Sequence, residues 1–362
     1  MNVIPARPEL EHVPPVPHGG HNSTLPPVAL RDFSANINPY GPSPRIWAAM
    51  QAVPIAQHPD PRATPLRHAL AAHTGVDPAA VLVGNGAADL IYQLATAYIR
   101  RGDRVVIVTP TFGEYAAAAR MMGATLINHP THPADGFALD LPALLATVQR
   151  TQPRLLFLCN PNNPTCTYYD QATIAALLHA CPHTLLILDE AFVSFVAQPW
   201  PAVELLTHAN LLILRSLTKD YALTGLRVGY ALGHPATIAA IEKVQPPWTV
   251  NALAQAATLA ALADTTHLAT TLAQIRQASS ALRTELVACG FAPLPSAVHF
   301  MLVPVHAAAV WQAMLLERGM LVRDCSSFGL PQHIRIAPQL PEDNCALVQA
   351  MQACQEQLCQ VA

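Results

Sequence analysis

Short apolar runs recur through the middle of the chain. Between residues 80 and 216 five of them, AVLVG, RVVIVTP, RLLFLCN, TLLILDE and NLLILRS, alternate with Ala- and Leu-rich stretches of helical character. Because these runs are continuously apolar, each predicts a strand buried on both faces, and strands separated by helices predict a mainly parallel sheet. The pattern therefore predicts an α/β domain whose ligand site lies beyond the carboxyl ends of the strands.

The alternation of apolar runs and helical stretches ends on either side of this region. After residue 250 a long helical stretch reaches about 288, followed by HFMLVPV, a helix near 306–318, MLVRDC, HIRIAP and a closing helix near 342–359. The first 45 residues are rich in Pro, Gly and Asn and read as an extended arm. We therefore expect an N-terminal arm (1–45) that packs near the small domain, a large domain (46–250) and a smaller α+β domain (251–362).

Composition narrows the class of protein. Of 362 residues 52% are hydrophobic and 12% charged, and the formal net charge is −3 without a basic stripe, so we expect no nucleic-acid partner. No apolar run approaches the roughly 20 residues of a membrane span, and the first 20 residues lack the apolar segment of a secretory signal. We expect a cytoplasmic protein that does not bind membranes.

Metal and disulfide chemistry are not indicated. The eight cysteines include no C-x-x-C pair, which argues against both a zinc site and a disulfide framework. His18 and His21 in HGGH form the nearest thing to a metal motif, but they lack further ligands at metal spacing. We therefore predict no metal.

Chemically useful residues follow the predicted strands. Asp189 ends one strand, Asn160 follows another, and Lys219 comes shortly after a third, while GNG at 84–86 leads from a strand into a helix whose N-terminal N–H groups can bind an anion. Singly, each feature has an ordinary explanation: a common turn, a helix cap or a solvated charge. In a doubly wound sheet they converge on one crevice, which suits an anionic cofactor with a nucleophilic partner.

The lysine is the most informative of these residues. Of the 20 basic residues only Lys219 and Lys243 are lysines, and we interpret Lys243 as a solvated charge. A lysine amine can lose its proton and form a Schiff base, whereas a guanidinium cannot. Beside Ser216, Thr218 and Arg227, Lys219 is therefore predicted to react as an amine.

Six motifs in order, GNG, TPTFGEY, NPNNPT, LDEAF, SLTK and GLRVGY, resemble the fold-type I pyridoxal-phosphate (PLP) enzymes and, within them, the histidinol-phosphate aminotransferase-like group. The segments HGG, DFSANINPYG, LRSLTK, PWTVNALA and VRDC are similar to the threonine-phosphate decarboxylases of cobalamin biosynthesis. The resemblance implies the fold-type I PLP-dependent transferase fold, with a mainly parallel sheet between helices and a smaller α+β C-terminal domain. It also implies a homodimer.

The resemblance assigns roles to individual residues. Lys219 would hold PLP covalently, Asp189 would pair with the protonated ring nitrogen, Phe112 would stack on the ring and Asn163 would bond its 3′-oxygen. The phosphate would lie against Gly86, Ala87, Ser216 and Arg227. The residues implied to contact a small phosphorylated amino acid are His18, Gly19, Asn36, Asn163, Arg323 and Arg335.

Three positions depart from the pattern of the family. Phe192 stands where aminotransferases carry a tyrosine and the decarboxylases a phenylalanine. Cys166 stands where a glycine is usual, and His58 replaces a tyrosine that reaches the PLP phosphate of the neighbouring subunit; we predict that His58 keeps this contact.

The resemblance thus implies decarboxylation of O-phospho-L-threonine to (R)-1-aminopropan-2-ol phosphate and carbon dioxide. The alternative is a histidinol-phosphate-type aminotransferase using 2-oxoglutarate and glutamate. A third possibility is a binding module that keeps the fold without the chemistry, against which the reactive set of Lys219, Asp189 and Arg227 argues.

Overall fold

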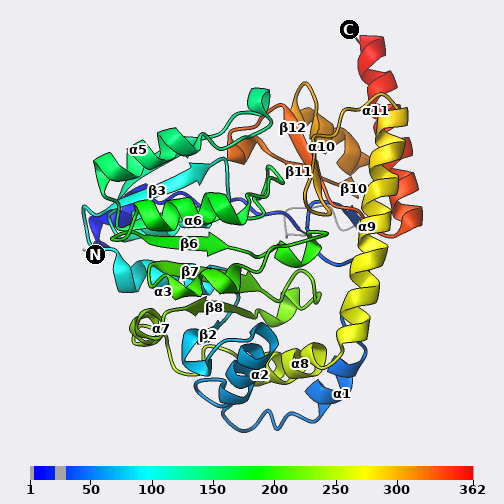
Figure 1. Ribbon diagram of the computed structural model, residues 1–362. Coiled ribbons are helices and arrows are strands. Elements are labelled where there is room, and N and C mark those ends of the chain that lie inside the picture. The colour runs from blue at the N-terminus through cyan, green and yellow to red at the C-terminus, as the bar shows by residue number, and fades with distance from the viewer. Residues whose placement is uncertain (1–3, 21–29, 362) are drawn as a thin grey trace.

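A seven-stranded sheet forms the centre of the larger part of the molecule (Figure 1). The computed structural model describes residues 4–20 and 30–361. The strand order is β2-β8-β7-β6-β5-β3-β4, and only the two pairings of β8 are antiparallel. The strands are β2 (Val81–Gly84), β3 (Arg104–Thr109), β4 (Thr125–Pro130), β5 (Leu155–Cys159), β6 (Leu185–Asp189), β7 (Leu211–Ser216) and β8 (Gly229–Gly233). The predicted mainly parallel sheet is confirmed.

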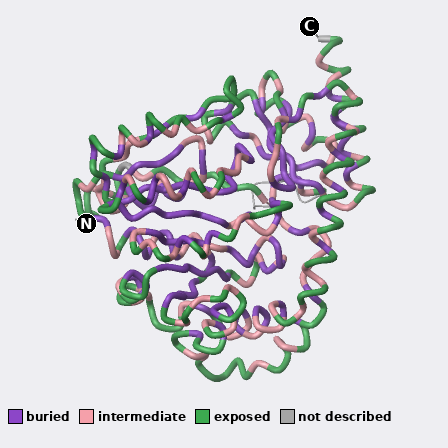
Figure 2. Tube along the Cα trace, viewed as in Figure 1, coloured by how far each residue is buried: buried purple, intermediate pink, exposed green. Residues whose placement is uncertain are grey.

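Helices cover both faces of this sheet. Alternate residues of a strand join different apolar clusters: Val106 packs with one, Val105 and Ile107 with the other. The first cluster includes side chains of α2 (Thr64–Thr74), α5 (Leu141–Thr151), α6 (Gln171–Ala180) and α8 (Ala252–Leu262). The second includes α3 (Ala87–Tyr98), α4 (Glu114–Met121) and α7 (Pro235–Glu242). Because both faces are covered, β2, β5, β6 and β8 are buried at every residue (Figure 2) and can be continuously apolar, whereas the edge strand β4 is partly exposed.

Side-chain caps fix where several helices begin. Asp140 accepts a hydrogen bond from the N–H of Ala143 at the start of α5, and Asp170 caps α6 in the same way. Asn251 and Asp264 cap α8 and the long helix α9 (Thr265–Ala288). Each cap satisfies an N–H group that the first turn of a helix leaves unpaired.

A smaller antiparallel sheet lies beside α9. Its order is β11-β12-β9, formed by β9 (Met301–Pro304), β11 (Arg323–Asp324) and β12 (His333–Ile336). The other C-terminal elements are α10 (Ala308–Glu317), β10 (Met320–Leu321) and α11 (Pro341–Val361). α9, α10, α11 and Phe33 share one apolar cluster with this sheet.

The N-terminal segment reaches this smaller sheet region. It contains the 3-10 helix η1 (Pro8–His12) and β1 (Arg31–Asp32), which pairs in parallel with β10, and α1 (Arg45–Gln51) follows. The domain boundaries at residues 45 and 250 remain predictions.

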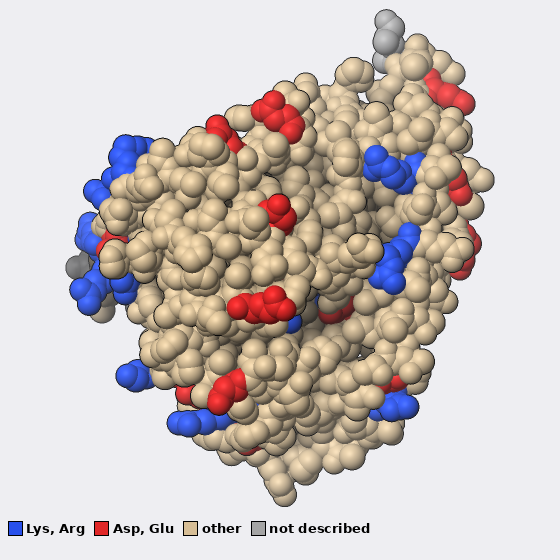
Figure 3. Space-filling model, in the orientation of Figure 1, with Lys and Arg blue, Asp and Glu red and all other residues tan. Residues whose placement is uncertain are grey.

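Surface charge is sparse on the face shown in Figure 3, in keeping with the 12% of charged residues. Within residues 4–20 and 30–361, no helix combines the length and apolar character needed to cross a bilayer. The same residues contain no cluster of His, Cys, Asp and Glu that could hold a metal ion, and His21 lies outside them.

Candidate active site

Lys219 lies in the loop that follows β7, and its backbone carbonyl accepts a hydrogen bond from the N–H of Asn38 at 2.9 Å. Burial lowers the pKa of its amine to about 8, helped by the positive charges of Arg227 and Arg335. The structure therefore brings these three predicted residues close together. With this pKa, a useful fraction of the amine is uncharged near neutral pH, as nucleophilic attack or proton abstraction requires.

Asp189 is the last residue of β6 and is 3% exposed. Its Oδ2 accepts a hydrogen bond from the Tyr115 hydroxyl at 2.6 Å, and its Oδ1 accepts one from the N–H of Ala191 at 2.9 Å. Burial raises the pKa of this carboxyl, because the two hydrogen bonds offset only part of the cost of desolvating a charge. Asp189 is thus positioned to pair with a cationic group in the crevice.

Gly86, Ala87, Ser216 and Arg227, the residues predicted to hold a phosphate, also come together. Gly86 precedes α3 with φ +87°, and a Cβ there would lie 2.7 Å from Nη2 of Arg227. Ser216 pairs in register with Gly229, where a Cβ would lie 2.7 Å from the backbone nitrogen of Ala87. A guanidinium, a hydroxyl and the N-terminus of a helix thus face the same small space, an arrangement that favours an anion.

Arg335 projects from β12 and is 5% exposed. Its Nη1 donates to Oδ1 of Asn163, its Nη2 donates to the Ser34 carbonyl at 2.6 Å, and its Nε has no partner in the described part of the chain. Burial lowers its pKa to about 10. A buried guanidinium with spare hydrogen-bonding capacity is a strong receptor for a carboxylate or phosphate. The hydrogen bond from Nη1 holds Asn163 beside it.

Arg323 forms hydrogen bonds with the N-terminal arm. Its Nη2 donates to the Pro17 carbonyl at 2.8 Å and to the Ser327 hydroxyl at 2.7 Å, and its Nη1 reaches the His18 carbonyl at 3.3 Å. These contacts occupy three of the five donors of a guanidinium. The structure therefore gives Arg323 a role in holding the arm, and only its remaining donors are available to a substrate.

His18 is oriented by groups that the sequence reasoning missed. Its Nε2 lies 2.8 Å from Oε1 of Glu114, and Oε2 of Glu114 accepts a 2.5 Å hydrogen bond from Tyr92. The hydrogen bond with His18 lowers the pKa of Glu114. The imidazole lies 5.9 Å from the ring of Phe112, which in turn meets the edge of Tyr115. His18 and Phe112 are therefore linked to Asp189 through Tyr115, which contacts both Phe112 and Asp189.

Gly19 and Asn36 complete the substrate side. A Cβ on Gly19 would lie 2.5 Å from the Ser34 carbonyl, the acceptor of Arg335, so only glycine allows the arm to come this close. Asn36 is 4% exposed, and its Oδ1 has no partner among the residues described. A buried amide oxygen without a donor is a ready contact for a ligand.

The three departures from the family pattern differ in their surroundings. Phe192 is 6% exposed and packs edge-on against Phe300 with ring centroids 5.0 Å apart. Cys166 has φ +64°, the left-handed backbone for which glycine is favoured. His58 is exposed and stacks on Trp248 at 4.6 Å, so within one chain it does not join the other site residues. Lys243 is exposed, as expected of a solvated charge.

The sequence reasoning missed Glu114 and Tyr115, although both stand in the TPTFGEY motif that it used. A carboxylate and a phenol at the start of the helix that follows a buried strand were a usable signal. Nothing in the sequence showed that their partners would be His18, almost 100 residues earlier, and Asp189.

Comparisons with known proteins establish the family of the chain. The family model for aminotransferase class I and II matches residues 30–350. The chain belongs to this family. It is 39% identical over 330 residues to the histidinol-phosphate aminotransferase of Symbiobacterium thermophilum, covering 90% of both chains.

Two solved structures extend the comparison, and they confirm the predicted fold. The histidinol-phosphate aminotransferase of Sinorhizobium meliloti in complex with pyridoxal-5′-phosphate superposes with a TM-score of 0.83 at 29% identity, covering 90% of both chains. The L-threonine-O-3-phosphate decarboxylase of Porphyromonas gingivalis gives 0.79 at 29% identity, covering 90% of this chain and 99% of the other.

Proposed function

We propose that this class I and II family member is a PLP-dependent aminotransferase of the histidinol-phosphate type, with glutamate and 2-oxoglutarate as the second substrate pair. The observation that carries the proposal is the buried amine of Lys219, which lies near Arg227 and Arg335 and whose pKa is lowered to about 8. The name of the 39% identical relative supports the choice of substrate. It favours the aminotransferase over the decarboxylase that the sequence motifs favoured.

The residues present fit PLP. Lys219 would hold it covalently, Asp189 would face its ring nitrogen, and Arg227 with the start of α3 would hold its phosphate. The buried carboxyl of Asp189 lacks a cationic partner in the described residues, and a protonated ring nitrogen would supply one. When bound, PLP supplies an electron sink that stabilises negative charge at the α-carbon of the substrate.

The side chains of this protein would then position the substrate and move its protons. Nζ of Lys219, in its neutral form, takes the proton from the substrate α-carbon. Arg335 holds the carboxylate of glutamate or the phosphate of histidinol phosphate, because its planar fork suits both groups. His18, held by Glu114, covers the face of the site next to Phe112 and limits the access of water.

A second candidate is decarboxylation of O-phospho-L-threonine. Phe192 supports it, because the buried phenylalanine offers no hydroxyl where aminotransferases resembling this chain carry a tyrosine. The relative from Porphyromonas gingivalis bears the corresponding name. The two reactions differ in whether the α-hydrogen or the carboxylate is presented for cleavage at the α-carbon of the substrate.

One experiment separates the two candidates. The PLP-loaded protein is incubated with histidinol phosphate plus 2-oxoglutarate, and separately with O-phospho-L-threonine alone. Glutamate formation in the first mixture supports the aminotransferase. Release of carbon dioxide in the second, without any keto acid, overturns it in favour of the decarboxylase.

We also propose a homodimer in which His58 reaches the cofactor phosphate of the partner subunit. Its imidazole is exposed and held flat against Trp248, which is 45% exposed, so both rings are free to meet a second copy. Trp47, 58% exposed, and Ile55, 81% exposed, leave further apolar surface in the same part of the sequence.

A further inference from the structure

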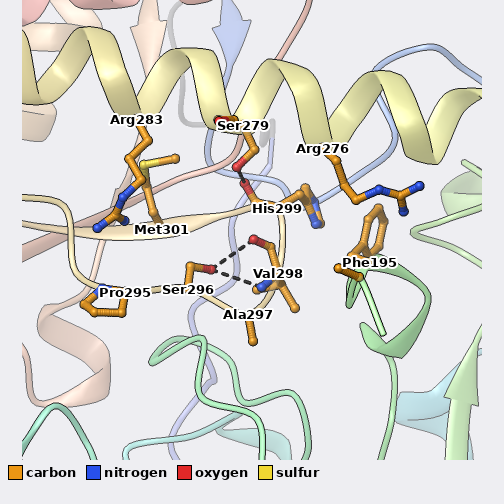
Figure 4. Close-up of a pocket in the computed structure, with 12 residues that line it drawn as sticks. Phe195, Arg276, Ser279, Arg283, Pro295, Ser296, Ala297, Val298, His299 and Met301 are labelled. Atoms are coloured by element: carbon orange, nitrogen blue, oxygen red, sulfur yellow. Dashed lines mark hydrogen bonds between the residues drawn. The ribbon is translucent and has the colours of Figure 1, made fainter. Parts of the chain in front are cut away.

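A pocket of about 460 Å³ lies against α9, outside the set of residues assigned to the active site (Figure 4). One wall comes from the segment that follows β6, which contains the 3-10 helix η4 (Val193–Phe195). The opposite walls come from α9 and from the turn that leads into β9. Phe195, Arg276, Ser279, Ser280, Arg283 and His299 are among its lining residues.

The wall that α9 contributes to this pocket is polar, whereas the face that a helix turns toward the rest of the protein is usually apolar. Arg276, Ser279, Ser280 and Arg283 occupy positions i, i+3, i+4 and i+7 of α9 and therefore share one face. Seven residues of helix place the two arginine α-carbons about 10 Å apart, with the two serines between them. No Asp or Glu lines the pocket, so its charge is positive.

The two arginines are not equivalent. Arg283 donates to the carbonyls of Pro293 and Leu294 at 2.8 and 2.7 Å, which fixes its guanidinium at one end of the pocket. Arg276 is exposed and makes no ion pair within the part of the chain that the structure describes. In Figure 4 the two side chains stand at opposite ends of the row of labelled α9 residues. Arg276 is thus the cation available to a ligand.

His299 supplies a second, independent observation. It is 2% exposed and lines the pocket, and neither ring nitrogen makes a well-aligned hydrogen bond to a described residue, although the backbone of Asn36 lies close enough to oppose part of the change in its pKa. Its ring packs on Phe195 with centroids 3.8 Å apart. Burial and the charge of Arg335 lower its pKa to about 3, so the imidazole is neutral and offers one donor and one acceptor. A bound polar group that bonds either nitrogen would recover the cost of burying it without a good partner.

We propose that this pocket binds a small, elongated dianion, such as a dicarboxylate. One acidic group pairs with Arg276, the hydroxyl of Ser280 and the ring N–H of His299 bond the middle of the ligand, and the second acidic group lies toward Arg283. The apolar rims formed by Phe195 and Met301 suit a short methylene chain between the two charges.

The position of the pocket connects it to the active site through one backbone step. The residue after His299 is Phe300, whose ring lies 5.4 Å from the guanidinium carbon of Arg335 and packs edge-on against Phe192. A ligand that forms a hydrogen bond with His299 therefore contacts the same chain segment whose next residue, Phe300, packs on Arg335. The binding itself is independent of which reaction the enzyme catalyses.

Calorimetric titration of the PLP-loaded protein with adipate tests the proposal, with hexanoate as the probe that lacks the second carboxylate. We expect adipate to bind with a Kd near ~1 mM or below, and hexanoate at least tenfold more weakly. Arg276→Gln should weaken adipate at least tenfold. Arg150→Gln, an exposed arginine on α5, is the matched control and should leave binding unchanged.

Arg335→Ala separates the new pocket from the active site, because a dicarboxylate can also bind at the substrate arginine. Adipate binding that persists in Arg335→Ala and is lost in Arg276→Gln supports the pocket. Binding lost only in Arg335→Ala overturns the proposal, as does an absence of adipate binding to the unmodified protein at 10 mM, about ten times the expected Kd. Since Arg276 is exposed, its substitution should not prevent folding, and an unchanged circular dichroism spectrum verifies this.

Discussion

The two halves of the candidate active site are built in different ways. The cofactor half, around Lys219, Asp189 and Gly86, comes from strand ends and the turns after them within one sheet. The substrate half, around His18 and Arg335, joins the N-terminal arm to the small sheet, and Arg335 bonds Ser34 across 301 residues of sequence. The first half is a property of one sheet, whereas the second exists only when distant segments dock.

This difference decides where hydrogen-bonding atoms are left without a partner among the described residues. In the cofactor half, Asp189 already accepts two hydrogen bonds from neighbours in the same sheet region. In the substrate half, Arg335 keeps an unpartnered Nε and Asn36 an unpartnered Oδ1. We conclude that the cofactor half is preorganised for one permanently bound group. The substrate half keeps unpaired hydrogen-bonding atoms for a ligand that binds and dissociates in each catalytic cycle.

The largest effect is expected from Lys219→Ala. Turnover should fall by more than about 10³-fold, because the only amine in the crevice is lost. The covalent link to PLP should also disappear, which borohydride reduction followed by mass spectrometry of the intact protein will detect. Lys243→Ala, at the exposed lysine, is the control and should retain both properties. Activity retained without Lys219 would show that the cofactor half does not carry the chemistry assigned to it.

Asp189→Asn should lower kcat by about 10²-fold, because a neutral amide cannot keep the ring nitrogen protonated. The amide oxygen can still accept from the N–H of Ala191 and the amide nitrogen can donate to the hydroxyl oxygen of Tyr115, so the local packing should persist. A buried charge without a counter-ion is costly, and we therefore expect the PLP-free variant to melt no lower than the parent protein. A marked drop in its Tm would mean that Asp189 serves mainly the fold.

Arg335→Ala should raise the KM for the anionic substrate by about 10²-fold and change the dissociation constant of PLP by less than threefold. This split follows from its place in the substrate half. Arg335→Lys keeps the charge but loses the fork that bonds both Asn163 and Ser34, so only part of the loss should be recovered. Equal weakening of PLP and substrate, measured by fluorescence titration and steady-state kinetics, would show that the halves are not separable.

The sequence allowed the cofactor half to be predicted almost completely. Its motifs GNG, LDEAF and SLTK sit at strand ends, and the carboxyl ends of neighbouring parallel strands must meet at one edge of a sheet. The same pattern placed the long helix α9 and the closing helix α11 close to their observed bounds.

The substrate half was predicted only through resemblance. Periodicity does not specify how an extended arm docks, so the contacts of His18 with Glu114 and of Arg323 with the Pro17 carbonyl could not be read from the sequence. Both depend on tertiary packing between segments that carry no regular pattern. The position of His299 could not be predicted for a related reason. The pocket that it lines forms only when α9 packs near the segment after β6.

The smallest effect is expected from Glu114→Gln. The amide keeps an oxygen for the hydroxyl of Tyr92 but loses the charge that orients His18, so we expect the substrate KM to rise about tenfold with kcat nearly unchanged. Glu242→Gln, which removes a carboxylate of α7 that pairs with Arg67 of α2, should change neither constant by more than about twofold. Because the arm is held by Arg323 as well, trypsin cleavage within residues 1–45 should be only slightly faster in Glu114→Gln. A fall in kcat with constant KM would assign Glu114 to the chemical step. The N-terminal arm, which Glu114 contacts through His18, would then be as preorganised as the cofactor half.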